Sequence, residues 1–421
     1  MMKILAISYA FPPSREPRAI QVSRLLSESE HEVCIICSDG TSPDKNDLVY
    51  SKTEEKLAGC IRVPFTKSII RGLTDKIYYR FWRHQWNRRN RVPDEFISWK
   101  KPVVDLISRS IKSNALNPDI LVTFGHPFTD HLIGLEIKRL YGLPWIAHFS
   151  DPWADNPFRK KDNYLDKENI KLEEQVIKSA DMIVMTSQET SDLVFQKYPE
   201  TDKFKSRILP HSFDDDLYPP KSLEIDSKIT IRHMGSLYGN RTAMPLLKAI
   251  QRLLVKKSSV LDNVKFEFIG DCDTGTIDKT LTETMPAGLI SLFPSVDYSE
   301  NLALMVNSDG LLLIDAPDSL SVFLPSKLIE YIGADNPIIG FTPKGAAAGL
   351  IRKIGGFIVE PGQEDDGAEE LESFINYLSS RRMSPTSTTW IKAEIRDEYS
   401  KKNVAQNFDS FLHELYRHKT I

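Results

Sequence analysis

The sequence of 421 residues lacks any apolar run approaching the roughly 20 residues that a membrane-spanning helix needs. Its start carries one basic residue, Lys3, and runs into Phe11-Pro12-Pro13 without a small-residue cleavage site. A secretory signal is therefore not predicted, and the first residues are expected to form a buried strand.

Cysteine is scarce, with four residues in the whole chain, too few for a disulfide scaffold, so a reducing cytoplasm is the expected compartment. Cys34 and Cys37 have the C-x-x-C spacing, but an odd spacing in a strand points two side chains to opposite faces. We expect no metal or redox site at this pair. Net charge is also small, at −4, which gives no reason to expect a nucleic-acid partner.

Short apolar runs alternate with helical stretches, a pattern typical of βαβ units and a parallel sheet. Thirteen runs are predicted strands: 4–8, 32–37, 61–63, 120–124, 145–149, 182–186, 207–209, 229–234, 264–269, 290–293, 311–314, 337–341 and 357–359. Helices are predicted between them, for example at 129–141, 188–198, 243–255, 326–332, 346–354 and 368–379. The fold class is therefore α/β.

Prolines and acidic residues gather after residue 212, where we place an interdomain linker. The prediction has four parts: an N-terminal, acceptor-side domain at 1–212, the linker at 213–228, a second domain at 229–390, and a helical tail at 391–421 that packs back on the first domain. Two doubly wound, Rossmann-like domains facing a central cleft are expected, with ligands at the carboxyl ends of the strands.

The segment from Leu324 to Gly333 is the most informative. Proline is favourable in the first turn of a helix, so a helix is expected to start near Pro325 and to present free N–H groups to an anion such as a diphosphate. Lys327 adds a positive charge in this first turn, a poor place for a cation unless an anion compensates it. Glu330 lies on the same face and can accept hydrogen bonds from a ribose. The alternative is an ordinary surface Lys–Glu pair.

Small residues, Gly235 and Ser236, follow the first strand of the second domain and allow a ligand to approach the backbone. Arg241 can hold phosphate oxygens bidentately. The alternative is a plain glycine turn with a solvent-facing arginine.

Three loops of the first domain leave the carboxyl ends of predicted strands, at 9–14, 124–128 and 148–153. His126, His148 and Asp151 are therefore candidates for one shared site, although a single histidine is more often structural.

Taken together and in this order, these motifs resemble glycosyltransferase family 4, in particular its bacterial surface-polysaccharide enzymes. The resemblance implies the GT-B fold, retention of anomeric configuration, and no metal or other cofactor. The motifs that carry it are the Phe-Pro-Pro loop, Gly125-His126-Pro127, Asp151-Pro152-Trp153, Gly235 with Arg241, and Pro325-Ser326-Lys327-Leu328-Ile329-Glu330-Tyr331.

The resemblance implies a role for each matching residue. His126 would lie beside the donor sugar and the acceptor hydroxyl. Arg241 and Lys327 would neutralise the leaving diphosphate, helped by backbone N–H groups near Leu324, Pro325 and Ser326. Glu330 would match the second glutamate of the E-x7-E motif, which binds the ribose of the donor nucleotide.

The sequence departs from the family pattern at two places. Val322 stands where the first glutamate of E-x7-E is expected, and Asp315 or Asp318 is a candidate replacement. The first loop lacks the usual Gly-Gly pair. Arg15 or Arg18 is instead a candidate to meet a phosphate of the acceptor. The acceptor-side residues are expected to be Pro13, Arg15, Arg18, His148 and Asp151 of the N-terminal domain.

Residues 67–101 are rich in basic and aromatic side chains, which is typical of a segment that lies on anionic lipid. The membrane contact is expected at Arg80, Trp82, Arg83, Trp86 and Arg88. A solvated helix whose aromatic side chains cover the sheet is the alternative; single-stranded nucleic acid is not expected.

The sequence thus predicts a retaining hexosyltransferase that moves a sugar from a nucleotide-sugar donor to a polyprenyl-diphosphate-linked saccharide, at the inner face of the plasma membrane. Two alternatives stay open: an enzyme of the UDP-N-acetylglucosamine 2-epimerase type, and a catalytically silent GT-B partner subunit.

Overall fold

The computed structural model describes residues 1–14, 16–39, 53–65, 77, 80–83, 85, 91–159, 163–222, 226–273, 275–317, 320–362, 364–383 and 389–419. Its contacts divide the chain into unit 1, Met1–Pro210 with Lys401–Ile421, and unit 2, His211–Ser400. These limits differ from the boundaries expected from the sequence, because residues 213–228 and 391–400 both belong to unit 2. Four residues predicted at functional sites, Arg15, Trp86, Arg88 and Asp318, lie outside the described residues.

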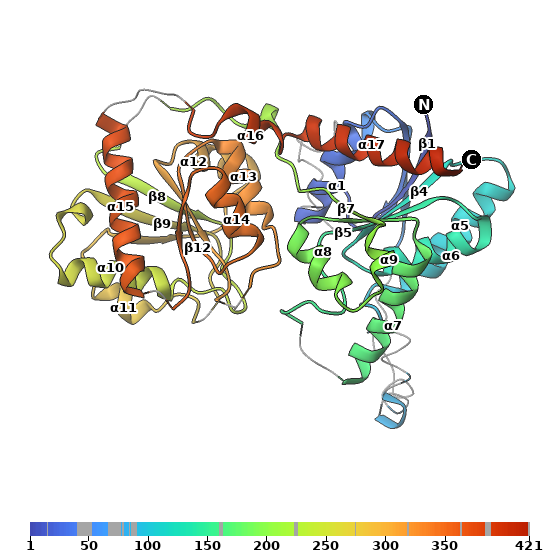
Figure 1. Ribbon diagram of the computed structural model, residues 1–421, viewed down its shortest axis with the longest axis horizontal. Helices are drawn as coiled ribbons and strands as arrows, with labels where there is room; N and C mark the ends of the chain where they lie inside the picture. Colours follow the sequence, from blue (N-terminus) through green and yellow to red (C-terminus); the bar gives the residue numbers. More distant parts are fainter. Residues whose placement is uncertain are drawn as a thin grey trace. The chain divides into compact units, whose positions relative to one another are not determined.

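Unit 1 is built on a parallel sheet with the strand order β3-β2-β1-β4-β5-β6-β7 (Figure 1). The described strands are β1 (Lys3–Ile7), β2 (Glu32–Ser38), β3 (Gly59–Val63), β4 (Ile120–Gly125), β5 (Trp145–Phe149), β6 (Met182–Met185) and β7 (Ser206–Ile208). The described helices are α1 (Pro17–Ser27), α5 (Lys100–Lys112), α6 (Thr129–Tyr141), α7 (Asn163–Ser179), α8 (Gln188–Phe195), α9 (Glu200–Lys203) and α17 (Lys401–Lys419).

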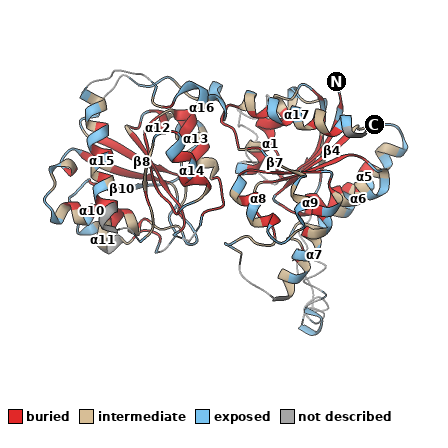
Figure 2. Cartoon of the chain, viewed as in Figure 1, coloured by how far each residue is buried: buried red, intermediate tan, exposed pale blue. Residues whose placement is uncertain are grey.

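Helices cover both faces of this sheet, as the buried strands in Figure 2 illustrate. Leu5 and Ile7 of β1 pack toward α5 and α6, whereas Ile4 and Ala6 pack toward α1 and α17. Alternate side chains of a strand point to opposite faces, so a strand buried on both sides is apolar throughout. This explains why the strands read as continuous apolar runs.

The last helix, α17, packs beside α1 on one face of the unit 1 sheet (Figure 1). Its apolar face shares a core with β1, β2 and β4, through Val404, Phe408, Leu412 and Leu415. The chain therefore returns to unit 1 after completing unit 2.

Unit 2 is also built on a parallel sheet, with the order β10-β9-β8-β11-β12-β13. Its described strands are β8 (Ile229–Met234), β9 (Val264–Ile269), β10 (Ile290–Phe293), β11 (Gly310–Ile314), β12 (Ile338–Phe341) and β13 (Phe357–Val359). Its described helices are α10 (Met244–Val255), α11 (Lys279–Glu283), α12 (Tyr298–Val306), α13 (Ser326–Ala334), α14 (Ala346–Lys353), α15 (Glu364–Met383) and α16 (Ala393–Asp397).

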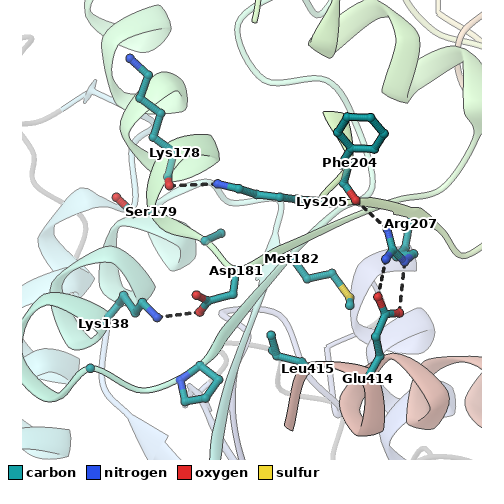
Figure 3. A pocket seen from close by; sticks show the side chains of 13 residues that line it. Lys138, Lys178, Ser179, Asp181, Met182, Phe204, Lys205, Arg207, Glu414 and Leu415 are labelled. Atoms are coloured by element: carbon teal, nitrogen blue, oxygen red, sulfur yellow. Dashed lines mark hydrogen bonds and ion pairs between the residues drawn. The ribbon is translucent and has the colours of Figure 1, made fainter. Parts of the chain in front are cut away.

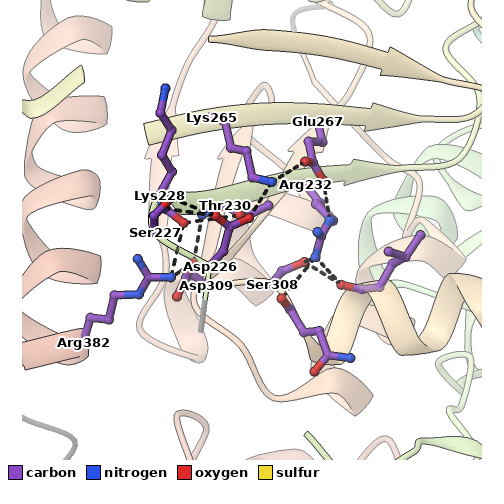
Figure 4. Close-up of polar contacts among 12 residues, drawn as sticks. Asp226, Ser227, Lys228, Thr230, Arg232, Lys265, Glu267, Ser308, Asp309 and Arg382 are labelled. Atoms are coloured by element: carbon purple, nitrogen blue, oxygen red, sulfur yellow. Dashed lines mark hydrogen bonds and ion pairs between the residues drawn. The ribbon is translucent and has the colours of Figure 1, made fainter. Parts of the chain in front are cut away.

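An ion-pair network joins β8, β9 and the end of α12 in unit 2 (Figure 4). Arg232 of β8 pairs with Glu267 of β9 at 2.7 Å and donates to the carbonyl oxygens of Leu304 and Asn307, both at 3.1 Å. The last carbonyl groups of a helix have no partner within it, so Arg232 caps the carboxyl end of α12. Burial alone would raise the pKa of Glu267, but hydrogen bonds from Lys265 and Arg232 outweigh it and keep that pKa low.

All thirteen predicted strands are present, with ends displaced by at most two residues, and the predicted class of two parallel α/β domains is confirmed. Pro17 is the first residue of α1, so Arg18 lies in the first turn of a helix. Within the described parts of the chain, no helix is both long and apolar enough to span a bilayer.

The basic aromatic segment divides into two parts. Phe96 packs against Tyr9 and Phe65, and Trp99 is 1% exposed in the core of unit 1. For Phe96 and Trp99, the alternative prediction, that the aromatic side chains cover the sheet, is correct. Trp82, in contrast, is 54% exposed, and Arg80 and Arg83 are exposed beside it.

Candidate functional site

The candidate donor site lies at the carboxyl edge of the unit 2 sheet, where β8 and β11 run side by side. Gly235 follows β8, and the loop after β11 leads into α13. Pro325 precedes that helix with φ −61° and ψ 129°, and Ser326 is its first residue, as the sequence predicts. The backbone N–H groups of the first turn have no helical acceptors, so this end of α13 favours an anion.

Lys327 extends from the first turn of α13 toward β8. Its Nζ lies 3.1 Å from Nε2 of His233, the buried fifth residue of β8. A Cβ atom on residue 235 would lie 3.2 Å from Cε of Lys327, and residue 235 has φ +88°. Glycine at this position therefore provides both the backbone conformation and the space for the lysine side chain.

The hydrogen bonds of His233 fix its tautomer. Its Nδ1 lies 3.0 Å from the carbonyl oxygen of Leu312, which can only accept, so Nδ1 carries the proton. Burial, together with the charge of Lys327, lowers the pKa of His233 well below 6.5, so the ring is neutral. Its Nε2 lone pair therefore accepts one of the three N–H groups of Lys327 and orients the ammonium group.

Arg241 is the second cation of the site. Its Nε lies 3.7 Å from Oδ1 of Asp315, and its guanidinium stacks over the Tyr238 ring at 4.7 Å. Asp315 is 5% exposed; it also accepts hydrogen bonds from the N–H of Ala316 at 2.8 Å and from Oγ of Ser321 at 2.5 Å. Both oxygens of Asp315 are thus engaged inside unit 2. It orients Arg241, and its predicted role in place of the missing glutamate stays a prediction.

The charge balance of the site favours an anion. Loss of hydration and the nearby charge of Arg241 lower the pKa of Lys327 to about 7, although Asp315 and Cys272 act in the opposite direction. Among the residues that the structure describes, no carboxylate lies within 4.0 Å of Lys327 Nζ. A bound anion would stabilise the charged form of Lys327 and would pair with both cations.

Glu330 faces a different environment from the one expected. Its Oε2 accepts hydrogen bonds from the hydroxyl groups of Tyr218, at 2.8 Å, and Tyr298, at 3.0 Å. Tyr218 comes from the predicted linker, and its ring packs on Gly333 of α13. The carboxylate is therefore oriented by two phenols, and its predicted role at the ribose stays a prediction. Val322, which the sequence places where the first glutamate of an E-x7-E motif would stand, is buried at 3% exposure.

In unit 1, the loops that carry the acceptor-side residues leave β1, β4 and β5, which are neighbours in the sheet. Arg18 and His148 are in contact: Nη2 of Arg18 lies 3.1 Å from both Nδ1 and the carbonyl oxygen of His148. Burial lowers the pKa of Arg18 to about 10, and the charges of Asp151 and Asp130 act against this shift. Arg18 is 8% exposed, so its cation is buried at the start of α1.

The other predicted residues of unit 1 lie in the loops that follow β1, β4 and β5. His126 is exposed, and its ring packs edge-on against Phe128 at 5.4 Å. Pro13 is half-buried in the loop after β1. Asp151 is half-buried and accepts a hydrogen bond from Oγ of Ser150 at 3.2 Å.

The loop after β5 is fixed by buried contacts. Trp153 stacks on Phe128 with ring centres 4.7 Å apart, and its Nε1 donates to Asn169 at 2.6 Å. The N–H of Ala154 donates to the Glu173 carboxylate at 2.7 Å. Asp151 is therefore attached to a loop that α7 holds on the body of unit 1.

Asp130 and His233 were not predicted at functional sites. Asp130, the second residue of α6, is fully buried and accepts the N–H of Tyr9 at 2.7 Å through Oδ2. Burial raises its pKa well above 3.8, although the hydrogen bond from Tyr9 and the charge of Arg18 act in the opposite direction. Both residues could have been found from the sequence, because each is a polar residue next to a proposed motif. His233 interrupts an apolar strand two residues before Gly235, and Asp130 follows the Gly125-His126-Pro127 loop.

A basic hollow of about 520 Å³ lies near the amino ends of β5, β6 and β7 in unit 1 (Figure 3). Its cations already have carboxylate partners: Lys138 pairs with Asp181 at 2.6 Å, and Arg207 pairs with Glu414. We therefore do not assign a ligand to this hollow.

No protein-family model matches the chain, and no curated protein matches its sequence. Solved structures match it over nearly their whole length. Sucrose-phosphate synthase from Thermosynechococcus elongatus has a TM-score of 0.66 at 11% identity, covering 99% of this chain and 100% of that one. HepE from Anabaena in complex with UDP-glucose has a TM-score of 0.62 at 13% identity, covering 98% and 100%.

A structure named as a UDP-N-acetylglucosamine 2-epimerase, from Listeria monocytogenes, has a TM-score of 0.55 at 12% identity, covering 99% of this chain and 97% of that one. With the strand orders of the two units, these likenesses establish the GT-B fold for this chain. At such low identity they establish the fold alone.

Proposed function

We propose that this protein is a glycosyltransferase that uses a UDP-sugar as donor and binds its diphosphate in unit 2. The observation that carries the proposal is the arrangement of Lys327, Arg241 and the first turn of α13 at the carboxyl edge of the sheet. Two cations lie there, and in the described part of the chain the one buried carboxylate, Asp315, pairs with Arg241 alone, which suits the binding of a diphosphate. The UDP and UDP-glucose complexes of HepE, a protein with the same fold, support this choice of donor.

The proposed reaction retains the configuration of the transferred sugar and belongs to the family 4 type. An acceptor hydroxyl attacks the anomeric carbon from the face that the diphosphate leaves, and its proton passes to the departing phosphate oxygen. Negative charge grows on the leaving diphosphate, and Lys327 and Arg241 stabilise it there. His126 is proposed beside the acceptor hydroxyl, and Glu330 at the ribose. No metal or other cofactor is part of this proposal.

The proposed acceptor is a polyprenyl-diphosphate-linked saccharide of surface-polysaccharide synthesis. Arg18 supports an anionic acceptor, because it is a buried cation without a carboxylate within 4.0 Å among the described residues. The exposed Arg80, Trp82 and Arg83 support contact with an anionic membrane on its cytoplasmic face.

A nucleotide panel tests the proposal. We expect UDP-sugars to stabilise the protein by about 2.7 kcal/mol at 100 times their dissociation constant, and GDP- and ADP-sugars to have weaker effects. UDP release that requires a lipid-linked saccharide would identify a transferase, and NMR of the product would test retention. Conversion of UDP-N-acetylglucosamine without any acceptor would favour the epimerase, for which the Listeria neighbour is the supporting observation. Binding without turnover would indicate a silent partner subunit, and no binding by any nucleotide would refute the proposal.

Donor affinity should depend on pH through Lys327. Its pKa is about 7 in the free protein, and a bound diphosphate raises it, so the complex holds more protons than the free protein above pH 7. Affinity for UDP-glucose should therefore fall as pH rises, by about 20-fold between pH 6.5 and 8.5. Both phosphates of UDP-glucose are esterified, so the ligand itself does not titrate in this range.

Isothermal titration in buffers of different ionisation enthalpy would measure the proton uptake. The groups that face Lys327 are Arg241, Asp315, Cys272 and His233. Lys327→Arg keeps a charge at every pH and should remove most of the pH dependence. A flat profile in the wild-type protein would mean that Lys327 does not meet the diphosphate.

A further inference from the structure

A second group of side chains with metal-binding chemistry lies in unit 1, away from the loops of the proposed acceptor side. It consists of Glu30 and His31, which connect α1 to β2, and His413 of α17. One ligand atom from each residue lies within 4.8 Å of the others. Nε2 of His413 is 2.8 Å from Oε1 of Glu30, and the two imidazole rings are 4.9 Å apart.

His31 is the unexplained member of this group. The residue is 8% exposed, and both of its ring nitrogens are buried without a hydrogen-bond partner among the described residues. A neutral imidazole has one donor and one acceptor, and burying both without partners is costly. A ligand that bonds to one of these nitrogens would remove part of that cost.

The turn that carries Glu30 and His31 is fixed to α17 by Asp409. This carboxylate accepts the hydroxyl of Ser29 at 2.7 Å and the N–H of Glu30 at 2.9 Å. Asp409 and His413 are one helical turn apart on α17, so the same helix face positions the turn and presents the third ligand. The group is therefore arranged before any ligand binds.

We propose that Glu30, His31 and His413 form a zinc site that joins α17 to the turn between α1 and β2. Two imidazoles and one carboxylate are a common ligand set for Zn²⁺, with water as the fourth ligand. In tetrahedral Zn²⁺ sites, ligand atoms lie about 3.3 Å apart, so the three side chains need to shift by only about 1 Å. Glu30 and His413 are 65% and 45% exposed, which leaves room for the water and a path for the metal.

Zinc at this position would stabilise unit 1 by holding α17 against α1. This zinc site does not depend on the proposed transferase function, because Glu30 and His31 precede the amino end of β2, whereas the proposed acceptor-side loops leave the carboxyl ends of β1, β4 and β5.

Titration of the full chain with Zn²⁺, after treatment with EDTA and its removal, tests the site. We expect binding of about one equivalent, and a melting temperature raised by roughly 5–10 °C at 100 times the dissociation constant. His413→Ala and Glu30→Gln should each weaken binding by at least about 10-fold and remove most of this shift. Both residues are partly exposed, so these variants are expected to fold. Gln406→Ala, an exposed position on the same helix, is the matched control and should bind Zn²⁺ like the wild-type protein.

The thiols of unit 1 are the competing ligands, since Cys37 and Cys60 lie 3.7 Å apart. With Co²⁺ in place of Zn²⁺, thiolate ligands give an intense near-ultraviolet charge-transfer band, which a site of two histidines and one glutamate lacks. Absence of Zn²⁺ binding, binding unchanged in His413→Ala, or a thiolate band would each overturn the proposal.

Discussion

Replacing Lys327 by methionine is expected to lower kcat for sugar transfer by about 100- to 1000-fold, the usual effect of removing one preorganised group that stabilises a leaving anion. Methionine keeps the length and the apolar stem of the side chain but removes the charge opposite the diphosphate. Because Lys327 is oriented by the neutral His233, the charge is held in place before the donor arrives. Donor turnover with saturating acceptor would measure the loss.

Lys256→Met is the matched control for this experiment. Lys256 also lies in unit 2, but its side chain is 55% exposed and its Nζ is 3.7 Å from Glu369. We expect this variant to retain wild-type turnover. A Lys327→Met protein that transfers sugar at the wild-type rate would remove Lys327 from the reaction.

Replacing Glu173 by alanine is expected to lower the free energy of unfolding by about 2–5 kcal/mol, because two donors lose a buried acceptor at about 1–3 kcal/mol each. The Glu173 side chain is fully buried and accepts three groups at 2.7 Å: the N–H of Ala154, the hydroxyl of Tyr198 and the ammonium of Lys197. The first two donors would lose this buried acceptor, while Lys197 keeps an ion pair with Asp155. Urea unfolding followed by tryptophan fluorescence is suitable, because five of the six tryptophans lie in unit 1.

The next residue in the chain provides the control. Glu174 pairs with Lys178 at 2.6 Å, but its side chain is 44% exposed, so Glu174→Ala should cost less than about 1 kcal/mol. Equal losses in the two variants would show that the buried bonds of Glu173 do not hold the loop after β5.

The strands could be predicted because each is buried on both faces and therefore leaves a continuous apolar run, as in Ile120–Gly125. The start of α13 could be predicted from Pro325, whose fixed φ suits the residue before a helix. Helix α1, which is not among the helices named from the sequence, also has an apolar face, at Ala19, Val22 and Leu26.

Contacts between distant parts of the chain could not be predicted from local patterns. Tyr218 reaches Glu330 across 112 residues, and Arg18 reaches His148 across 130. No spacing in the sequence shows that a tyrosine of the expected linker would hold the carboxylate expected at the ribose. The tautomer of His233 likewise depends on a carbonyl group of a neighbouring strand, which only the assembled sheet brings within reach.

The position of α17 has a consequence for the synthesis of the protein. The ribosome makes residues 1–210 first, yet one face of their sheet is covered by Val404, Phe408, Leu412 and Leu415, which follow the 190 residues of unit 2. At a synthesis rate of about 5–20 residues per second, this helix begins to emerge roughly 10–40 s after residue 210, and later still after the strands it covers. During that interval the apolar side chains that α17 covers in the finished unit lack this cover, and we expect ribosome-associated chaperones to bind the nascent chain there.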